Sequence, residues 1–166
     1  MLLLHRKKLG GRYHLIVRAL QSLLRCLFVP YAKSETQSMD PDQAKKDLCL
    51  GPNHAAAFAR ILTALCDPTL SSVSRSKHTS RDELNDETKK ARSIAGQHLQ
   101  YLIEEYCECQ LAGRLSAEMK AALNPGLYAV FAVMPQDVMR NLNAAMTSSS
   151  RSIFKALYDE YKRFGR

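Results

Sequence analysis

The side chains best placed to do chemistry in this chain are cations on two amphipathic segments, one near each end. Arg12, Arg18 and Arg25 recur through residues 12–28, and Lys162 and Arg163 lie on the polar edge of the closing segment. Ammonium and guanidinium groups spaced along a helix bind phosphate oxygens without reading the bases. These five residues are therefore predicted to contact RNA phosphate or a protein partner, from a basic N-terminal helix and a basic C-terminal edge.

The distribution of charge supports a binding role for the N-terminal segment. The formal net charge of the 166 residues is +8. Seven cations precede the first acid, Glu35, and the remainder is close to neutral; the seven are Arg6, Lys7, Lys8, Arg12, Arg18, Arg25 and Lys33. A basic segment can meet RNA, an acidic protein or an anionic membrane surface, and charge alone does not choose among them.

Residue types used in catalysis are present, but not in catalytic patterns. Cys107 and Cys109 form a Cys-x-Cys without a second pair, and a helix would point the two thiols apart, so we expect no metal site. There is no glycine-rich phosphate loop and no Gly-x-Ser-x-Gly elbow. Glu104, Glu105 and Glu108 are expected on the outward side of a long helix, and His98 at a helix interface. We predict a non-enzymatic protein without a cofactor or a small-molecule substrate.

The first residues and the cysteines bear on compartment. "MLLLHRKKLGG" has three leucines before its charges, too few for a signal peptide or a membrane span. The five cysteines are an odd number scattered through helical sequence, which favours a reducing compartment. An acid-free, arginine-bearing N-terminus also resembles a mitochondrial presequence. The alternative prediction is therefore a helical protein of the mitochondrial matrix whose basic N-terminus is cleaved on import.

Helical periodicity accounts for most of the chain. The first apolar face is expected to contain Leu15, Ile16, Ala19, Leu20, Leu23, Leu24, Leu27 and Phe28. A second helix should start with Asn53 as its N-cap and end at Asp67-Pro68. The longest helix should begin at Asp86, and its inner side should contain Ile94, Ala95, Leu99, Leu102, Ile103, Tyr106 and Leu111. A short helix over 116–123 should break at "NPG", and residues 127–134 should form a buried helix.

Two further helices complete the predicted set. Pro135 should start one of them, which carries Val138, Met139, Leu142 and Met146. The serines of residues 148–150 should cap the last helix, whose apolar stripe is Ile153, Phe154, Leu157, Tyr158, Tyr161 and Phe164. We expect this stripe to pack inward and the cations to face solvent.

These elements predict an all-α fold of about six helices, either a helical-repeat-like (armadillo-type) stack or an irregular bundle. One helical domain should span residues 9–166, with polar loops at 32–52 and 67–83 and a basic N-terminal extension over residues 1–8.

Five stretches in this order resemble a known domain: "GRYHLIVRALQSLLRCLF", "FARILTALCDPT", "LNPGLYAVFAVM", "RNLNAAM" and "SSRSIFKALYDEYKRFGR". Together they are similar to the C-terminal domain of the Urb/Npa family of nucleolar pre-ribosomal-RNA processing proteins, the second of its two large scaffolds. The matching motif positions have an architectural character: Pro125, Gly126, Tyr128, Leu142, Asn143, Phe154, Leu157, Tyr158, Tyr161 and Phe164.

The resemblance implies a non-catalytic scaffold in early assembly of the large ribosomal subunit, located in the nucleolus or nucleus. The partners it implies are a second large helical scaffold and an RNA helicase, with pre-ribosomal RNA as a further contact; it implies neither a membrane nor a metal. Two departures stand out, because family members are much longer and their closing helix runs on to a tryptophan, which this chain lacks.

Overall fold

The structure, a computed structural model, describes residues 12–31, 50–67 and 81–165, without the side chains of 81–87. These residues form six helices: α2 (His14–Cys26), α4 (Pro52–Cys66), α5 (Arg81–Ala112), α6 (Ala117–Val133), α7 (Gln136–Ala145) and α8 (Ser148–Phe164). The all-α prediction is confirmed. The predicted N-terminal extension and most of both polar loops lie outside the described residues.

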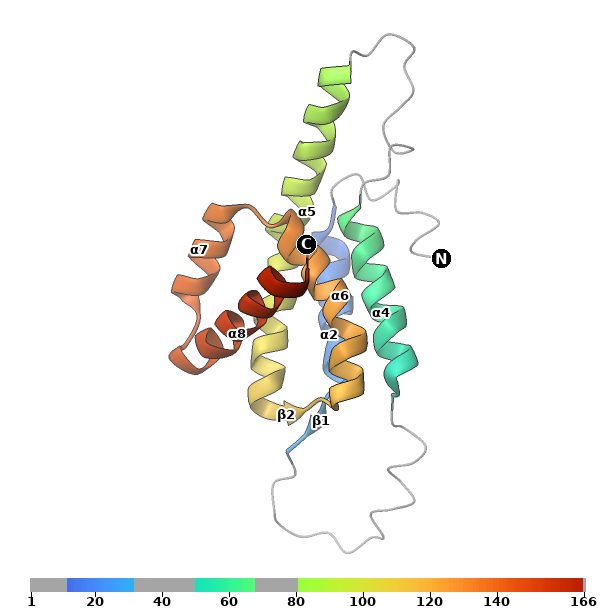
Figure 1. Ribbon diagram of the computed structural model, residues 1–166, viewed down its shortest axis with the longest axis vertical. Helices are drawn as coiled ribbons and strands as arrows, with labels where there is room; N and C mark the ends of the chain where they lie inside the picture. The colour runs from blue at the N-terminus through green and yellow to red at the C-terminus, as the bar shows by residue number, and fades with distance from the viewer. Residues whose placement is uncertain (1–11, 32–49, 68–80, 166) are drawn as a thin grey trace, which may run out of the picture.

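Helix α5 is the central element of the bundle. It contacts each of the other described helices, and Figure 1 shows α2 and α4 on one side of it and α7 and α8 on the other. Its buried face includes Leu99, Leu102, Ile103 and Tyr106, as predicted, whereas Leu111 is 45% exposed. The first turns of α5, which are polar in sequence, project beyond the other helices in Figure 1. The helix begins at Arg81, five positions before the predicted start.

Helix α2 packs along α5 with a narrower face than its composition suggested. Val17, Leu20 and Leu24 are buried, at the spacing of one helical stripe, whereas Leu15 and Leu23 are 65% and 51% exposed. The prediction of a broad buried face on this helix was therefore wrong in part. The reason is that α2 lies at the edge of the bundle, where α5 is its main neighbour and covers only one stripe.

The predicted break at "NPG" is also wrong, because α6 continues through Pro125 to Val133. A proline in a helix interior removes one hydrogen bond and costs about 3 kcal/mol. The next residue offers compensation: a Cβ on Gly126 would lie 2.6 Å from the Cα of Ala59, so only glycine lets α4 and α6 approach this closely. Burial along that contact favours a continuous helix.

A two-residue strand pair was missed by the sequence analysis. β1 (Val29–Pro30) pairs antiparallel with β2 (Gly113–Arg114), which joins the end of α2 to the end of α5. A Cβ on Gly113 would meet the carbonyl oxygen of Val29 at 2.7 Å, so the pairing needs a glycine there. Strands of two residues are too short to show the alternation by which strands are predicted.

Two helix caps differ from the predicted ones. Gly51, not Asn53, is the N-cap of α4, with Pro52 in the first turn, a position where proline needs no amide partner. The N-cap of α8 is Thr147, whose hydroxyl accepts a hydrogen bond from the amide of Ser150 at 3.3 Å. Ser116 caps α6 by accepting from the amide of Met119 at 3.2 Å.

The closing helix packs by the predicted stripe except at its end. Phe154 and Leu157 are buried, and Ile153, Tyr158 and Tyr161 are partly buried against the same core, as predicted. Phe164 is 74% exposed. The packed stripe thus ends at Tyr161, whose ring stacks on Phe131 of α6 with 5.4 Å between centroids.

Candidate functional site

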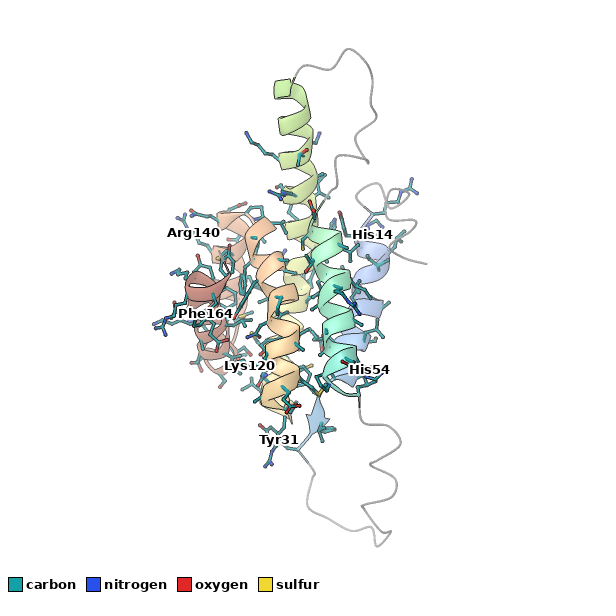
Figure 2. All side chains as sticks on the ribbon, turned by 45° about the vertical axis from the view of Figure 1, so that its right-hand side comes forward. His14, Tyr31, His54, Lys120, Arg140 and Phe164 are labelled. Carbon is teal, nitrogen blue, oxygen red and sulfur yellow. The ribbon has the colours of Figure 1, made fainter. Side chains whose placement is uncertain are left out.

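The five cations singled out in the sequence do not form one surface. Figures 1 and 2 show α2 and α8 apart, with α5 and α6 between them; His14 and Phe164, labelled in Figure 2, mark the two sides. Arg12 and Arg18 are exposed on or beside α2, and Lys162 and Arg163 are exposed on α8. The structure therefore separates two cationic regions.

Arg25 is engaged within the protein. Its Nη2 donates to Oε2 of Glu105 at 2.7 Å, and its Nε donates to the other carboxylate oxygen, so the pair is bidentate. Glu105 is only 6% exposed, which corrects its predicted outward position. Hydrogen bonding to Glu105 raises the pKa of Arg25 above its usual value. Because a buried carboxylate needs its partner, Arg25 supports the α2–α5 contact and is less available to a phosphate.

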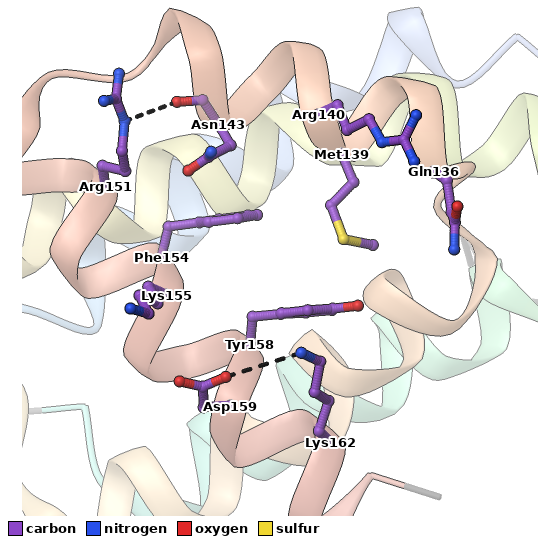
Figure 3. Close-up of a pocket in the computed structure, with 10 residues that line it drawn as sticks. All are labelled: Gln136, Met139, Arg140, Asn143, Arg151, Phe154, Lys155, Tyr158, Asp159 and Lys162. Atoms are coloured by element: carbon purple, nitrogen blue, oxygen red, sulfur yellow. Dashed lines mark hydrogen bonds and ion pairs between the residues drawn. The ribbon is translucent and has the colours of Figure 1, made fainter.

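An open groove of about 470 Å³ lies between α7 and α8 (Figure 3). Its walls combine amides, cations, one carboxylate and apolar side chains: Gln136, Met139, Arg140, Asn143, Arg151, Phe154, Lys155, Tyr158, Asp159 and Lys162. Of the predicted binding residues only Lys162 lies here. We take this groove as the candidate site.

Arg151 holds the two helices of the groove together. Its Nε donates to the carbonyl oxygen of Asn143 at 2.9 Å, and its Nη2 donates to the carbonyl oxygen of Met146 at 3.0 Å. These carbonyls belong to the last turn of α7, where helical partners are missing and a cation is favoured. The guanidinium of Arg151 is thereby used to set the shape of the groove.

The floor of the groove is part of an aromatic cluster. Phe154 and Tyr158 are parallel, with ring centroids 6.3 Å apart. Tyr158 also contacts Phe131 at 5.5 Å between centroids. Lys162 places its Nζ 4.4 Å from the centroid of Tyr158 and 4.0 Å from a carboxylate oxygen of Asp159. The floor is rigid, and one face of the Tyr158 ring is covered by a cation.

Two cations of the groove remain free. Arg140 on α7 and Lys155 on α8 are exposed, and within the described part of the chain neither has an ion-pair or hydrogen-bond partner. Figure 3 shows them on opposite walls, with the Met139 side chain between α7 and α8. The site therefore presents an apolar floor inside a cationic rim, an arrangement suited to binding an anionic ligand.

Comparison with known proteins was made against family models, curated proteins and solved structures. The model of the Urb2/Npa2 family matches residues 1–166. The chain belongs to the Urb2/Npa2 family. No curated protein and no solved structure gives a match.

Membership of the Urb2/Npa2 family confirms the resemblance found in the sequence and implies a role in ribosome biogenesis. The Urb2/Npa2 proteins are nucleolar ribosome-biogenesis factors and are not known as enzymes. Within the described residues, no three His, Cys, Asp or Glu side chains are grouped to hold a metal, and no helix has the length and apolarity to cross a membrane.

Eight of the ten positions of the Urb2/Npa2 motif fall into two structural groups. Leu142, Phe154 and Leu157 are buried in the core, and Gly126 lies against Ala59 of α4. The second group contacts the groove or the α6–α8 interface: Asn143 lines the groove, Tyr158 forms its floor, and the rings of Tyr128 and Tyr161 lie 6.0 Å apart. Pro125 and Phe164 are exposed. An architectural role for the motif as a whole stays a prediction.

The α7–α8 groove was not found in the sequence, although both helices carry its signal. On α7, Gln136, Arg140 and Asn143 lie on one face at spacings of four and three. On α8, Arg151, Lys155 and Asp159 lie on one face at spacings of four. The connection between the two helices is two residues long, which makes them neighbours. What the spacing cannot supply is the angle at which the rows meet.

Proposed function

We propose that this chain is a non-catalytic assembly module in early biogenesis of the large ribosomal subunit, acting in the nucleolus. It binds protein partners first, among them a second large helical scaffold and an RNA helicase, and contacts pre-ribosomal RNA through phosphates. The observation that carries the proposal is the family match over residues 1–166. An open groove with a cationic rim on the helical bundle supports it.

Protein binding is placed first because of the construction of the α7–α8 groove. Its floor contains Met139, Phe154 and Tyr158, and apolar floors with a polar rim are typical of peptide and helix recognition. A surface devoted to RNA backbone would be expected to consist of cations and amides without such a floor.

RNA contact is assigned to the cations that the fold leaves free. Arg12 and Arg18 are exposed at α2, and Arg163 is exposed on α8. Two residues predicted with them already have partners. Arg25 pairs with Glu105, and Lys162 lies over the ring of Tyr158 and near Asp159. We expect the free residues to give weak binding that falls steeply with salt, because phosphate contacts release counterions.

The test is affinity purification of the tagged chain from cells at moderate salt, with and without nuclease, followed by identification of protein and RNA together. Large-subunit assembly factors that remain after nuclease treatment are the expected result. Their loss with nuclease would make RNA the primary attachment. Recovery of mitochondrial proteins with a shortened N-terminus would overturn the proposal.

A matched variant sharpens this experiment. Arg18→Glu changes a free cation of α2, whereas Lys90→Glu makes the same change in net charge at an exposed cation on α5. We expect the first variant to lose the recovered RNA while keeping the protein partners. Equal loss of RNA from the Lys90→Glu chain would show that net charge, and not the α2 surface, controls recovery.

A further inference from the structure

We propose that the α7–α8 groove docks an acidic peptide segment that inserts one large apolar side chain between two or more carboxylates. This rests on the proposed function as an assembly module and specifies the chemistry of one partner. Three features of the groove support this assignment: its cationic rim, its apolar floor and the covered faces of its aromatic rings.

The charge of the rim selects an anionic ligand. The groove is lined by four cations, Arg140, Arg151, Lys155 and Lys162, and by one carboxylate, that of Asp159. Arg151 donates to the α7 carbonyls and Lys162 is 4.0 Å from Asp159, so among the described residues the groove cations without a hydrogen-bond or ion-pair partner are Arg140 and Lys155. They stand on opposite walls in Figure 3. A ligand that satisfies both must carry anionic groups on both sides of its centre.

The floor between these cations selects an apolar anchor. Met139 is partly buried, and its flexible thioether can adapt to an inserted side chain. The volume of about 470 Å³ is in the range of small-ligand pockets and accommodates one or two large side chains. A leucine or phenylalanine placed there would be removed from water, which is the main source of affinity in peptide grooves.

An RNA base fits this floor less well than an apolar side chain. A base needs an open aromatic face on which to stack. In Tyr158 one face lies under the Lys162 ammonium, 4.4 Å from the ring centroid, and the ring is also packed against Phe131 and Phe154. Phe154 itself is 5% exposed. The groove therefore has aromatic residues without a stacking platform, which favours protein over RNA.

The shape of the groove is set before a ligand binds. Arg151 ties the last turn of α7 to α8 by two hydrogen bonds of 2.9 and 3.0 Å. The floor is fixed by the contact of Phe131 with Phe154, 5.8 Å between ring centroids. A preformed groove spares the ligand the entropy cost of ordering its receptor.

The experiment measures fluorescence anisotropy of a labelled synthetic peptide, Glu-Glu-Asp-Leu-Phe-Asp-Glu, against the purified full chain. Arg140→Glu combined with Lys155→Glu is expected to weaken binding at least 10-fold. The matched control, Arg60→Glu combined with Lys90→Glu, makes the same change in net charge on exposed positions outside the groove and should alter affinity less than 3-fold. Thermal melts verify that each variant is folded.

A second pair of measurements separates a peptide site from an RNA site. Met139→Ala removes part of the floor without changing charge, and should weaken the peptide several-fold while leaving the binding of a ten-nucleotide uridine RNA unchanged. A peptide in which leucine and phenylalanine become serine should bind as weakly to the wild type as the original does to Met139→Ala. Equal weakening of RNA and peptide, or tighter RNA binding in the groove, would overturn the proposal.

The failure of this inference is distinguishable from that of the proposed function. A chain that co-purifies with large-subunit assembly factors but does not bind the peptide retains the assembly role and loses this groove as its acidic-peptide site. A chain that binds the peptide but recovers no assembly factor keeps the groove and loses the assembly role.

Discussion

An arginine on one side of α5 has an ion-pair partner, whereas an arginine on the other side has none among the described residues. On the side of α2, Arg25 is matched by a buried carboxylate, that of Glu105, and the helices close on each other. On the side of α7 and α8, Arg140 faces a groove without a carboxylate partner in the described part of the chain. Arg25 on the α2 side is therefore satisfied within the fold, whereas Arg140 on the α7–α8 side has a charge that a ligand can meet.

The comparison shows that the presence of cations does not identify a binding surface. The decisive feature is whether the fold supplies each cation with a partner, because a carboxylate bound in bidentate fashion occupies the hydrogen-bond donors of a guanidinium. The closed side also contains a close helix contact, in which Gly126 and Ala59 bring α6 against α4. Long side chains on α7 and α8 line the groove between those two helices.

The largest expected effect tests the close packing of the closed side. In Gly126→Val, the new Cβ would lie 2.6 Å from the Cα of Ala59, a backbone atom that cannot rotate away. Overpacking costs about 1–3 kcal/mol and more where backbone must move, so we expect at least about 3 kcal/mol lost from the free energy of unfolding in urea. Gly51→Ala, which meets nothing within 4 Å, is the control and should change stability by less than about 1 kcal/mol. Equal effects would contradict the contact.

The next effect tests whether the buried stripe of α8 stabilises the open side of the bundle. Leu157 is 2% exposed, so Leu157→Ala should cost about 2–5 kcal/mol as a cavity. Phe164→Ala removes a larger side chain that is 74% exposed, and should cost less than about 0.5 kcal/mol. Both are measured by thermal and urea unfolding. Should Phe164→Ala prove as damaging as Leu157→Ala, the last turn of α8 must pack in a way that this structure does not show.

A smaller effect tests the partnership of Arg25 on the closed side. Arg25→Met leaves the nearly buried Glu105 carboxylate without its bidentate donor, and we expect a loss of stability that the 58% exposure of the arginine side chain keeps below that of Leu157→Ala. Arg140→Met, on the open side, should be neutral within about 0.5 kcal/mol. A double-mutant cycle with Glu105→Gln measures the coupling. A coupling of zero would mean that Arg25 is as free as Arg140.

The smallest effect concerns a buried thiol on the closed side. Burial raises the pKa of Cys66 from 9.0 to about 12. The folded state therefore holds the thiol proton more tightly than the unfolded chain, so its contribution to stability is full below pH 9 and is lost as the pH rises towards 12. Between pH 8 and pH 10 we expect about 1 kcal/mol of this loss. The variant Cys66→Ala, less stable throughout, should show a flatter pH dependence; identical slopes would place the thiol in water.

Sequence periodicity was sufficient for helices whose stripes are unbroken, and α8 is the clearest case. Phe154, Leu157, Tyr158 and Tyr161 lie at spacings that only a helix can bury together, and they are buried or partly buried. The helix through Pro125 could not be predicted in this way. Its continuity depends on the approach of Gly126 to Ala59, 67 positions earlier in the chain, and local rules assign a proline to a break.

The candidate site shows the same limit. Glu105 reads as a surface residue beside Glu104 and Glu108, and its burial becomes visible only with Arg25, 80 residues away, in place. The groove depends on the angle between α7 and α8, which Arg151 sets through backbone carbonyls that any sequence would supply. Residue type and spacing identify the candidate side chains, whereas their partners are decided by tertiary packing.

The pairing of α2 with α5 also has a consequence for the timing of synthesis. The Arg25–Glu105 bond spans 80 residues, and β1 and β2 join the same two regions. At a translation rate of about 5–20 residues per second, α2 would wait roughly 4–16 s before its partner helix is made. During that interval Val17, Leu20 and Leu24 have no α5 to cover them, beside free arginines. A chaperone that recognises basic, apolar helices would meet this nascent chain at α2.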